Sequence, residues 1–450
     1  MAAWNPEVRN ELEQSLVDLA GRALEHAADQ GASSAEVSIG QGQGFSATVR
    51  KQDVETIEHN RDKNLGITVY FGHRSGNVST TDFSDKALAE SVAAACNIAR
   101  YTEEDPFNGL ADESLLATEF PDLDLYHPWN IAMDDAIDLA ARCEKVALDS
   151  DPAISNTEGA TVSSHDGTDV YANSHGFIGL SRGSRHSLSC SVVAGEGANM
   201  QRDYWYDSCR DSADMQSAES IGAECSRRTL RRIGARKMKT GEYPVVFEPQ
   251  ISGSLLSHLV SAISGGSLYR KASFLLDQLE HQIFPEFVNI YERPFLQKAA
   301  GSAAYDAEGV KTRDNDFVRN GVLRSYLLGS YAARKLELQT TANAGGVHNL
   351  IIDPTIDGGL DEIVAGLDRG VVVSELIGFG VNTVTGDYSR GAFGFWVENG
   401  EIMYPVQEFT IAGNLREMFQ NIEAVGSDFN PRKNTRAGSI KISRLTIAGE

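Results

Sequence analysis

The hydrophobic period of the chain changes twice within its first hundred residues, and this change limits the folds open to it. Apolar residues first recur every three or four positions, the spacing of a helix, over Pro6–Gln30. Segments in which apolar and polar residues alternate follow, as in half-buried strands. A second helical stretch, "SDKALAESVAAACNIARY", then begins with Ser84 in the N-cap position. The pattern predicts an α+β unit with an antiparallel sheet between two helices.

Each predicted helix has one apolar stripe, which we expect to face a core. The stripe of the first helix consists of Leu12, Leu16, Leu19, Ala23 and Ala27. That of the second consists of Leu88, Val92, Cys96 and Ala99. The alternating segments between the helices are "AEVSI", "FSATVRKQDVETIE", "LGITVYFG" and "GNVSTTD". The glycine-rich stretch "GQGQGF" lies between the first two segments, so we predict a turn there rather than a phosphate-binding loop.

The remaining chain divides at composition changes. An acidic, proline-containing connection over residues 103–128 leads to a helix predicted over Ile131–Leu148 and then to a strand-rich run over 161–197. The major boundary is expected near Gly241. We therefore predict a first α+β unit over 1–125, a central α+β unit that completes the N-terminal half over 126–240, and a C-terminal β-rich domain over 241–450.

Two Asn-Gly dipeptides lie between strand-like segments in the C-terminal half. They are Asn320-Gly321 in "FVRNGVLRSYLL" and Asn399-Gly400 in "FGFWVENGEIMYPV". Both residues of such a pair adopt positive φ readily, so each dipeptide predicts a two-residue β-hairpin. The fold class we expect is α+β: an N-terminal α/β half with antiparallel sheets and flanking helices, and a C-terminal β-rich, barrel-like domain.

The formal net charge of −23 disfavours a nucleic-acid partner, because the whole molecule repels phosphate. One basic segment, Arg227–Lys239, ends a predicted helix and has no interleaved aromatic residues for base stacking. We interpret it as a solvated helix end and leave open whether it serves an interdomain joint or a partner. No basic, apolar leader and no membrane-spanning apolar run is visible, so we expect a cytoplasmic protein without membrane contact.

Cysteine and histidine spacings give no recognised metal pattern. Five cysteines, an odd number without a C-x-x-C spacing, argue against a disulfide framework and a zinc knuckle. His165, His175 and His186 lie in the strand-rich run at spacings of ten and eleven, which match no known ligand motif. No phosphate loop or H-E-x-x-H helix is present, and no serine can be tied to a histidine and an aspartate by sequence alone. The sequence itself therefore assigns no catalytic, cofactor-binding or metal-ligating residue.

Two stretches still merit attention as candidate sites. "ISGSLLSHLVSAISGG" predicts a short apolar helix that ends in glycines and carries one histidine, His258, without a nearby carboxylate. We interpret His258 as a core or interface residue, with a ligand role as the alternative. Asp387, Ser389 and Arg390 in "TGDYSRGAFGFW" are interpreted as turn residues before an aromatic strand, with a peptide-contacting loop as the alternative.

Several stretches along nearly the whole chain resemble the TldD/PmbA family, also called modulators of DNA gyrase, and within it the PmbA (TldE) branch. They are "LGITVYFG" with "STTDFS", "ANSHGF", "GGSLYRKASFLLDQLEHQIFP", "AYDAEGVKTRDNDFVRNGVLRSYLLGSYAARKL", "AGGVHN" and "GDYSRGAFGFWVENGEIMYPVQEFTIAGNL". The resemblance implies a two-part architecture, assembly as dimers and a metallopeptidase context. In the TldD branch, an H-E-x-x-x-H helix and a cysteine near the C-terminus supply the metal ligands and a glutamate general base.

Transferring those positions to this sequence leaves none of the four functional groups. The first histidine falls on Ser257, the glutamate on His258, the second histidine on Ala262 and the cysteine on Ala437. One imidazole falls short of the three protein ligands of a hydrolytic zinc site. The resemblance therefore implies no catalytic or metal-binding residue and no cofactor in this chain, with zinc in the TldD-like partner.

From this resemblance we expect a noncatalytic subunit of a TldD–TldE metallopeptidase complex that acts on unfolded peptides, in leader-peptide trimming and antitoxin degradation. The partner would be a TldD-like paralogue in a heterodimer, while a homodimer of the isolated chain stays open. The alternative is a stand-alone homodimeric peptide-binding adaptor without a proteolytic role. A third reading is an independent peptidase whose ligands come from His281, His348 or the group around His165.

Overall fold

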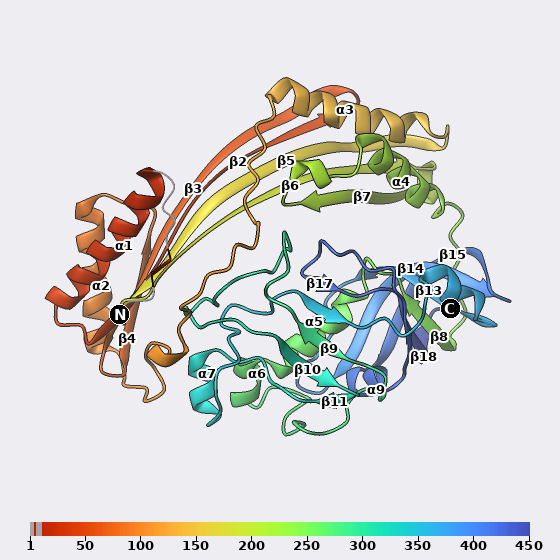
Figure 1. Ribbon diagram of the computed structural model, residues 1–450. Helices are drawn as coiled ribbons and strands as arrows, with labels where there is room; N and C mark the ends of the chain where they lie inside the picture. Colours follow the sequence, from red (N-terminus) through yellow and green to blue (C-terminus); the bar gives the residue numbers. More distant parts are fainter. Residues whose placement is uncertain (1–3, 6–10) are drawn as a thin grey trace.

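The N-terminal half of the protein is built on one long, curved sheet. The computed structural model describes residues 4–5 and 11–450. Figure 1 shows this sheet arching over the C-terminal half. The strand order is β1-β6-β5-β2-β3-β4, and β7 pairs with β6. Pairing is antiparallel apart from the short parallel β1–β6 contact. The strands are β1 (Trp4–Asn5), β2 (Ser34–Arg50), β3 (Asp53–Phe71), β4 (Arg74–Thr80), β5 (Ile154–Asn173), β6 (Ile178–Ala194) and β7 (Gln201–Cys209).

Two pairs of helices cover opposite ends of this sheet (Figure 1). Helices α1 (Glu11–Asp29) and α2 (Asp85–Tyr101) share one core with β2, β3 and β5, and α3 (Met133–Asp149) and α4 (Ala218–Leu230) share another with β5 and β6. The predicted cap is confirmed, since Ser84 Oγ accepts a hydrogen bond from Ala87 N. The predicted stripes are buried except for Leu12, which is 40% exposed. The start predicted for the first helix, residues 6–10, lies outside the described residues.

The predicted turn at "GQGQGF" is wrong, because these residues lie inside the continuous strand β2. Gly40, Gly42 and Gly44 pair with β3 on one side and β5 on the other. A Cβ on Gly42 would stand 2.7 Å from the imidazole of His165. The glycines, two residues apart, therefore share one face and make room for groups on the neighbouring strands.

The hairpin turn between β2 and β3 instead falls at Lys51 and Gln52, within a segment predicted as one strand. Both residues have positive φ, 54° and 65°. Their N–H groups donate to the buried carboxylate of Glu144 on α3, at 2.9 and 2.8 Å. A residue almost one hundred positions away thus holds a turn that lacks the usual Asn-Gly signal.

The connection over residues 102–132 crosses from the sheet to the C-terminal half. It contains one turn of 3₁₀ helix, Glu113–Leu115, after which Ala117 N donates to Gly309 O at 3.0 Å. Further on, Lys298 N donates to Leu123 O at 2.9 Å. Backbone hydrogen bonds therefore fix this predicted loose connection against the second half.

Five strands of the C-terminal half close into a barrel, in agreement with the predicted barrel-like domain. The order is β15-β14-β13-β8-β18, and β18 pairs back to β15. Both predicted hairpins are confirmed: φ is 51° and 75° at Asn320-Gly321, and 52° and 80° at Asn399-Gly400. The barrel strands are β8 (Gly241–Phe247), β13 (Arg369–Ile377), β14 (Asp387–Glu398), β15 (Glu401–Asn414) and β18 (Ile440–Ala448). A further strand, β16 (Ile422–Val425), pairs antiparallel with β18.

A smaller sheet and short helices pack beside the barrel. The sheet order is β11-β10-β9-β12-β17. Its strands are β9 (Ile290–Glu292), β10 (Asn315–Arg319), β11 (Val322–Leu323), β12 (Leu350–Ile352) and β17 (Thr435–Arg436). The helices are α5 (Gly253–Ile263), α6 (Gly265–Tyr269), α7 (Ser330–Lys335), α8 (Leu360–Ala365) and α9 (Leu415–Gln420). None of the described helices is long and apolar enough to cross a membrane.

Candidate functional site

A cavity of about 560 Å³ lies where the two halves of the molecule meet, and we call it the interdomain pocket. Strand β7 and the end of α4 contribute one wall, and α5, β13, β14 and the segment before β17 contribute the other. Its lining comprises Arg202, Asp203, Tyr204, Trp205, Tyr206, Arg228, Arg232, Pro249, Gln250, Ile251, Gly253, Ser254, Ser257, Ser374, Glu375, Leu376, Arg390, Lys433 and Thr435.

Two arginines of the basic segment Arg227–Lys239, which begins in the last turn of α4, line this pocket, so the interpretation of the segment as a solvated helix end is wrong for Arg228 and Arg232. Arg228 is only 6% exposed, with Nη2 3.3 Å from Asp203 Oδ2 and Nη1 3.6 Å from Glu248 Oε2. Arg232 is also buried, with Nη2 2.6 Å from Glu375 Oε2 on β13. Its guanidinium lies 3.8 Å from the centre of the Phe393 ring. The segment therefore joins the two halves through ion pairs and aromatic contacts.

Helix α5 carries the stretch with the single histidine. Its apolar residues recur at helical spacing and face the barrel core: Leu255, Leu256, Leu259, Ala262 and Ile263. Helix α5 ends at Ile263, just before the two glycines, which begin the next helix, α6. Ser264 Oγ accepts a hydrogen bond from Ser267 N and caps α6. A Cβ added to Gly265, the first residue of α6, would stand 2.3 Å from the Cβ of Ala332 on α7. Close packing of two helices therefore explains the glycine.

His258 is half-buried and follows Ser257, which lines the pocket. Its ring packs edge-on against Tyr388, with centroids 5.9 Å apart, and its Nε2 has no hydrogen-bond partner. Burial, and then the nearby Arg390 cation, lower the pKa of His258 from its ordinary 6.5. This ring packing is the geometry of a packed residue, and whether His258 has a ligand role stays a prediction.

The positions carried over from the metal-binding branch offer poor surroundings for a metal ion. Ser257 is exposed, and its hydroxyl donates to Gly253 O at 3.1 Å. Ala262 is 0% exposed within the barrel core, and Ala437 is also buried. Methyl groups at these two places supply no donor atom, so the residues present do not fit zinc. Across residues 4–5 and 11–450, no group of three His, Cys, Asp or Glu side chains is arranged to hold a metal ion.

The other candidate histidines differ in burial and in hydrogen-bond partners. His165 and His175 are exposed, whereas His186 is buried and hydrogen bonds to Ser164 Oγ at 2.9 Å and to the His127 carbonyl at 2.7 Å. His281 is exposed beside the Leu279 carbonyl, and His348 hydrogen bonds to the Gly301 carbonyl. All five cysteines are free and buried, as expected of small hydrophobic residues: Cys96, Cys143, Cys190, Cys209 and Cys225.

Asp387, Ser389 and Arg390 belong to strand β14, so their interpretation as turn residues is wrong. Ser389 pairs with Ala412, and Arg390 with Ile411, of β15. The short-range pattern missed this because the strand begins with polar residues at the barrel rim. Arg390 lines the interdomain pocket, and the alternative of a peptide contact at this residue stays a prediction.

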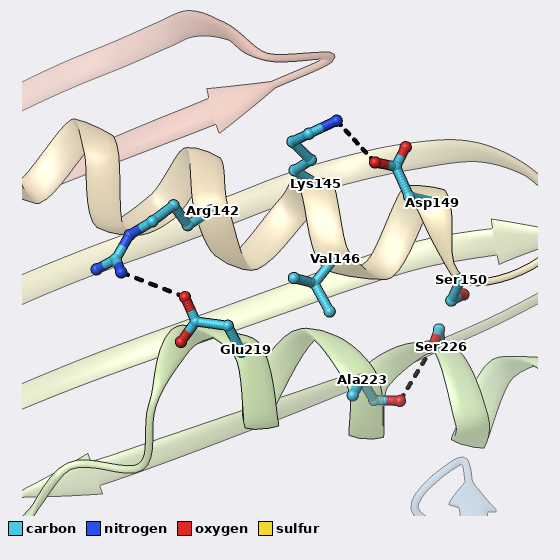
Figure 2. Close-up of a pocket in the computed structure, with 8 residues that line it drawn as sticks. All are labelled: Arg142, Lys145, Val146, Asp149, Ser150, Glu219, Ala223 and Ser226. Atoms are coloured by element: carbon cyan, nitrogen blue, oxygen red, sulfur yellow. Dashed lines mark hydrogen bonds and ion pairs between the residues drawn. The ribbon is translucent and has the colours of Figure 1, made fainter.

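A second hollow lies between α3 and α4 on the outside of the sheet (Figure 2). Figure 2 shows that its charged groups pair with each other: Arg142 with Glu219 at 3.2 Å and Lys145 with Asp149 at 2.7 Å. These exposed pairs leave no converging reactive groups. The interdomain pocket is therefore the better candidate site.

Comparison with known proteins gives a family along most of the chain. Three family models of the PmbA/TldA metallopeptidases match: domain 1 over residues 35–99, the central domain over 126–233 and the C-terminal domain over 240–449. The chain belongs to the PmbA/TldA metallopeptidase family. This confirms the family resemblance noted from the sequence.

Individual members of the PmbA/TldA family resemble the chain closely. Metalloprotease PmbA of Escherichia coli O157:H7 is 49% identical over 418 residues, 92% of each chain. A solved structure described as a modulator of DNA gyrase, from Bacteroides thetaiotaomicron, is 29% identical, with a TM-score of 0.92 over 98% of this chain and 100% of the other. TldE from Thermococcus kodakarensis shares the fold, at 21% identity and a TM-score of 0.83 over 97% and 100% of the two chains.

Proposed function

We propose that the chain is a noncatalytic subunit of a TldD–TldE-type metallopeptidase complex that acts on unfolded peptides in the cytoplasm. A TldD-like paralogue would carry the zinc and the general base. Leader-peptide trimming and antitoxin degradation are the expected processes. The observation that carries this proposal is the set of side chains at the four transferred positions, Ser257, His258, Ala262 and Ala437, which supplies one imidazole and two buried methyl groups.

The interdomain pocket supports a role in handling substrate. It lies directly beside Ser257 on α5, at the place where the metal-binding branch has its first ligand. Its lining combines three aromatic residues, Tyr204, Trp205 and Tyr206, with charged residues from both halves. A binding site that mixes apolar walls with a few polar groups suits a peptide segment.

The test is assembly followed by cleavage. The chain and its TldD-like paralogue, each purified without a tag, are mixed in equal amounts and separated by size exclusion with light scattering. We expect a mixed dimer that cleaves an unfolded protein such as reduced, alkylated casein. A chain that stays a homodimer in the presence of the paralogue would instead support the stand-alone adaptor.

A reciprocal control separates the contributions of the two chains. The paralogue with its metal-ligating histidines changed to alanine is paired with this chain, and cleavage should then be lost although the dimer forms. Cleavage that persists in this mixed dimer would assign the activity to this chain and contradict the proposal.

A further inference from the structure

Cationic side chains outnumber carboxylates in the lining of the interdomain pocket, although the whole chain has a formal charge of −23. Two carboxylates, Asp203 and Glu375, line the pocket. The cations that line it are Arg202, Arg228, Arg232, Arg390 and Lys433. A positive cavity in a strongly acidic molecule concentrates anions locally while the remaining surface repels them.

Three of these five cations have carboxylate partners within the protein. Arg202 pairs with Glu158, Arg228 with Asp203 and Glu248, and Arg232 with Asp203 and Glu375. The Arg228–Glu248 and Arg232–Glu375 pairs link the two walls of the pocket, and all three cations have their charge matched by carboxylates of the protein.

Arg390 and Lys433 are different, because among the described residues no carboxylate lies in ion-pair distance of either. Arg390 Nη2 donates to the Leu376 carbonyl at 3.4 Å, and its buried Nε has no partner. Lys433 Nζ donates to the Gln250 carbonyl, also at 3.4 Å. Burial, and then the Arg228 cation, lower the pKa of Lys433. Two partly desolvated cations in one cavity are unfavourable until an anion joins them.

Neutral donors complete the site. Ser374, on β13, lines the pocket and is only 5% exposed, and its buried hydroxyl has no hydrogen-bond partner among the described residues. Ser254, in the first turn of α5, also lines the pocket and has a buried, unpartnered hydroxyl. The positive end of the α5 dipole adds to the attraction for a negative group.

We propose that the interdomain pocket binds a carboxylate of a peptide, with Arg390 and Lys433 as its counter-ions and Ser254 and Ser374 as hydrogen-bond donors. The choice of a peptide rests on the proposed function and on the cavity itself. The cavity is larger than a small inorganic anion and is lined by aromatic residues, which such an anion would not contact favourably. The carboxylate is the C-terminus of the peptide or an acidic side chain, because both present the same two oxygens. The site anchors an unfolded substrate beside α5.

The experiment is calorimetric titration of the full-length, isolated chain with four otherwise identical hexapeptides. One has a free C-terminus, one has an amidated C-terminus and a central glutamate, one has both carboxylates, and one has neither. We expect at least tenfold weaker binding of the peptide without a carboxylate, since charge-assisted hydrogen bonds are lost. The two singly charged peptides distinguish a C-terminal anchor from an acidic side chain.

Two variants test the residues. Arg390→Gln and Lys433→Gln should each weaken binding of the carboxylate peptides about tenfold and leave the uncharged peptide unaffected. Arg319→Gln, at an exposed position away from the pocket, is the matched control. Thermal melting of every variant checks folding. If one variant fails to fold, the comparison of the four peptides on the wild-type chain still tests the proposal.

The proposal is overturned if all four peptides bind equally, if none binds, or if inorganic phosphate and acetate alone bind as tightly as the peptides. Its failure is distinguishable from failure of the proposed function, because titration uses the isolated chain and assembly is measured with the paralogue. A mixed dimer without carboxylate selectivity would reject only the site. Selective binding without a mixed dimer would reject only the complex.

Discussion

Arg432 Nη1 lies 2.6 Å from Oδ2 of Asp207, a β7 carboxylate that is almost fully buried. The pair joins the C-terminal half to the long sheet. Arg432→Ala should lower the free energy of unfolding by roughly 1–3 kcal/mol, because it leaves a buried carboxylate without its cation. Urea unfolding measures the change.

A suitable control for this pair is Arg319→Ala, which removes an exposed ion pair with Asp316. Such a pair contributes about 0–1 kcal/mol. Equal losses in the two variants would show that the Arg432–Asp207 contact adds nothing beyond an ordinary surface pair.

Glu144 holds the β2–β3 turn through the N–H groups of Lys51 and Gln52. Glu144→Ala removes both acceptors and should cost roughly 1–3 kcal/mol of unfolding free energy. Amide hydrogen exchange should accelerate most at Lys51 and Gln52, because these two N–H groups lose their acceptors. Glu55→Ala, which removes an exposed partner of Arg50, is the control and should change stability by less than about 1 kcal/mol.

Gly44 has no room for a side chain, since a Cβ would stand 2.7 Å from the carbonyl oxygen of Ser164. Gly44→Ala should therefore lower the melting temperature. Gly21 in α1 has nothing within 4 Å of such a Cβ, so Gly21→Ala should raise stability by about 0.5–1 kcal/mol through helix propensity. A loss of stability in both variants would contradict the steric explanation.

His258 makes stability depend on pH. Its pKa is lowered in the folded protein, so the unfolded chain binds a proton first as the pH falls below the ordinary value of 6.5. The contribution of His258 is complete above that value and is lost as the pH falls through the folded pKa. Unfolding free energy measured from about pH 8 to pH 5 should fall more steeply for the wild type than for His258→Gln. Parallel curves would argue against a desolvated imidazole.

Metal content tests the transferred positions directly. Elemental mass spectrometry of the purified, untagged chain without its paralogue should give a zinc content close to zero, because one imidazole cannot supply a hydrolytic site. Near one tightly held zinc per chain would contradict this expectation and direct attention to the other histidines. The paralogue, measured in parallel, is the positive control.

Short-range patterns in the sequence determined the elements whose conformation depends on neighbours along the chain. The capped helix after Ser84 and the hairpins at Asn320-Gly321 and Asn399-Gly400 follow from local φ preferences and from hydrophobic period. The same reasoning failed at Gly40–Gly44, where glycine normally signals a turn. Their role in β2 depends on side chains from other strands that occupy the space of a missing Cβ.

Only the tertiary structure decided the candidate site. Arg228, Ser254, Ser374, Arg390 and Lys433 come from five separate segments, and no spacing along the chain links them. Their convergence follows from closure of the barrel and from the arch of the sheet above it (Figure 1). The burial that leaves Arg390 and Lys433 without a carboxylate partner in the part of the chain that the structure describes is a property of this packing. Local sequence sets backbone preference, whereas desolvation and charge pairing depend on which distant residues share a cavity.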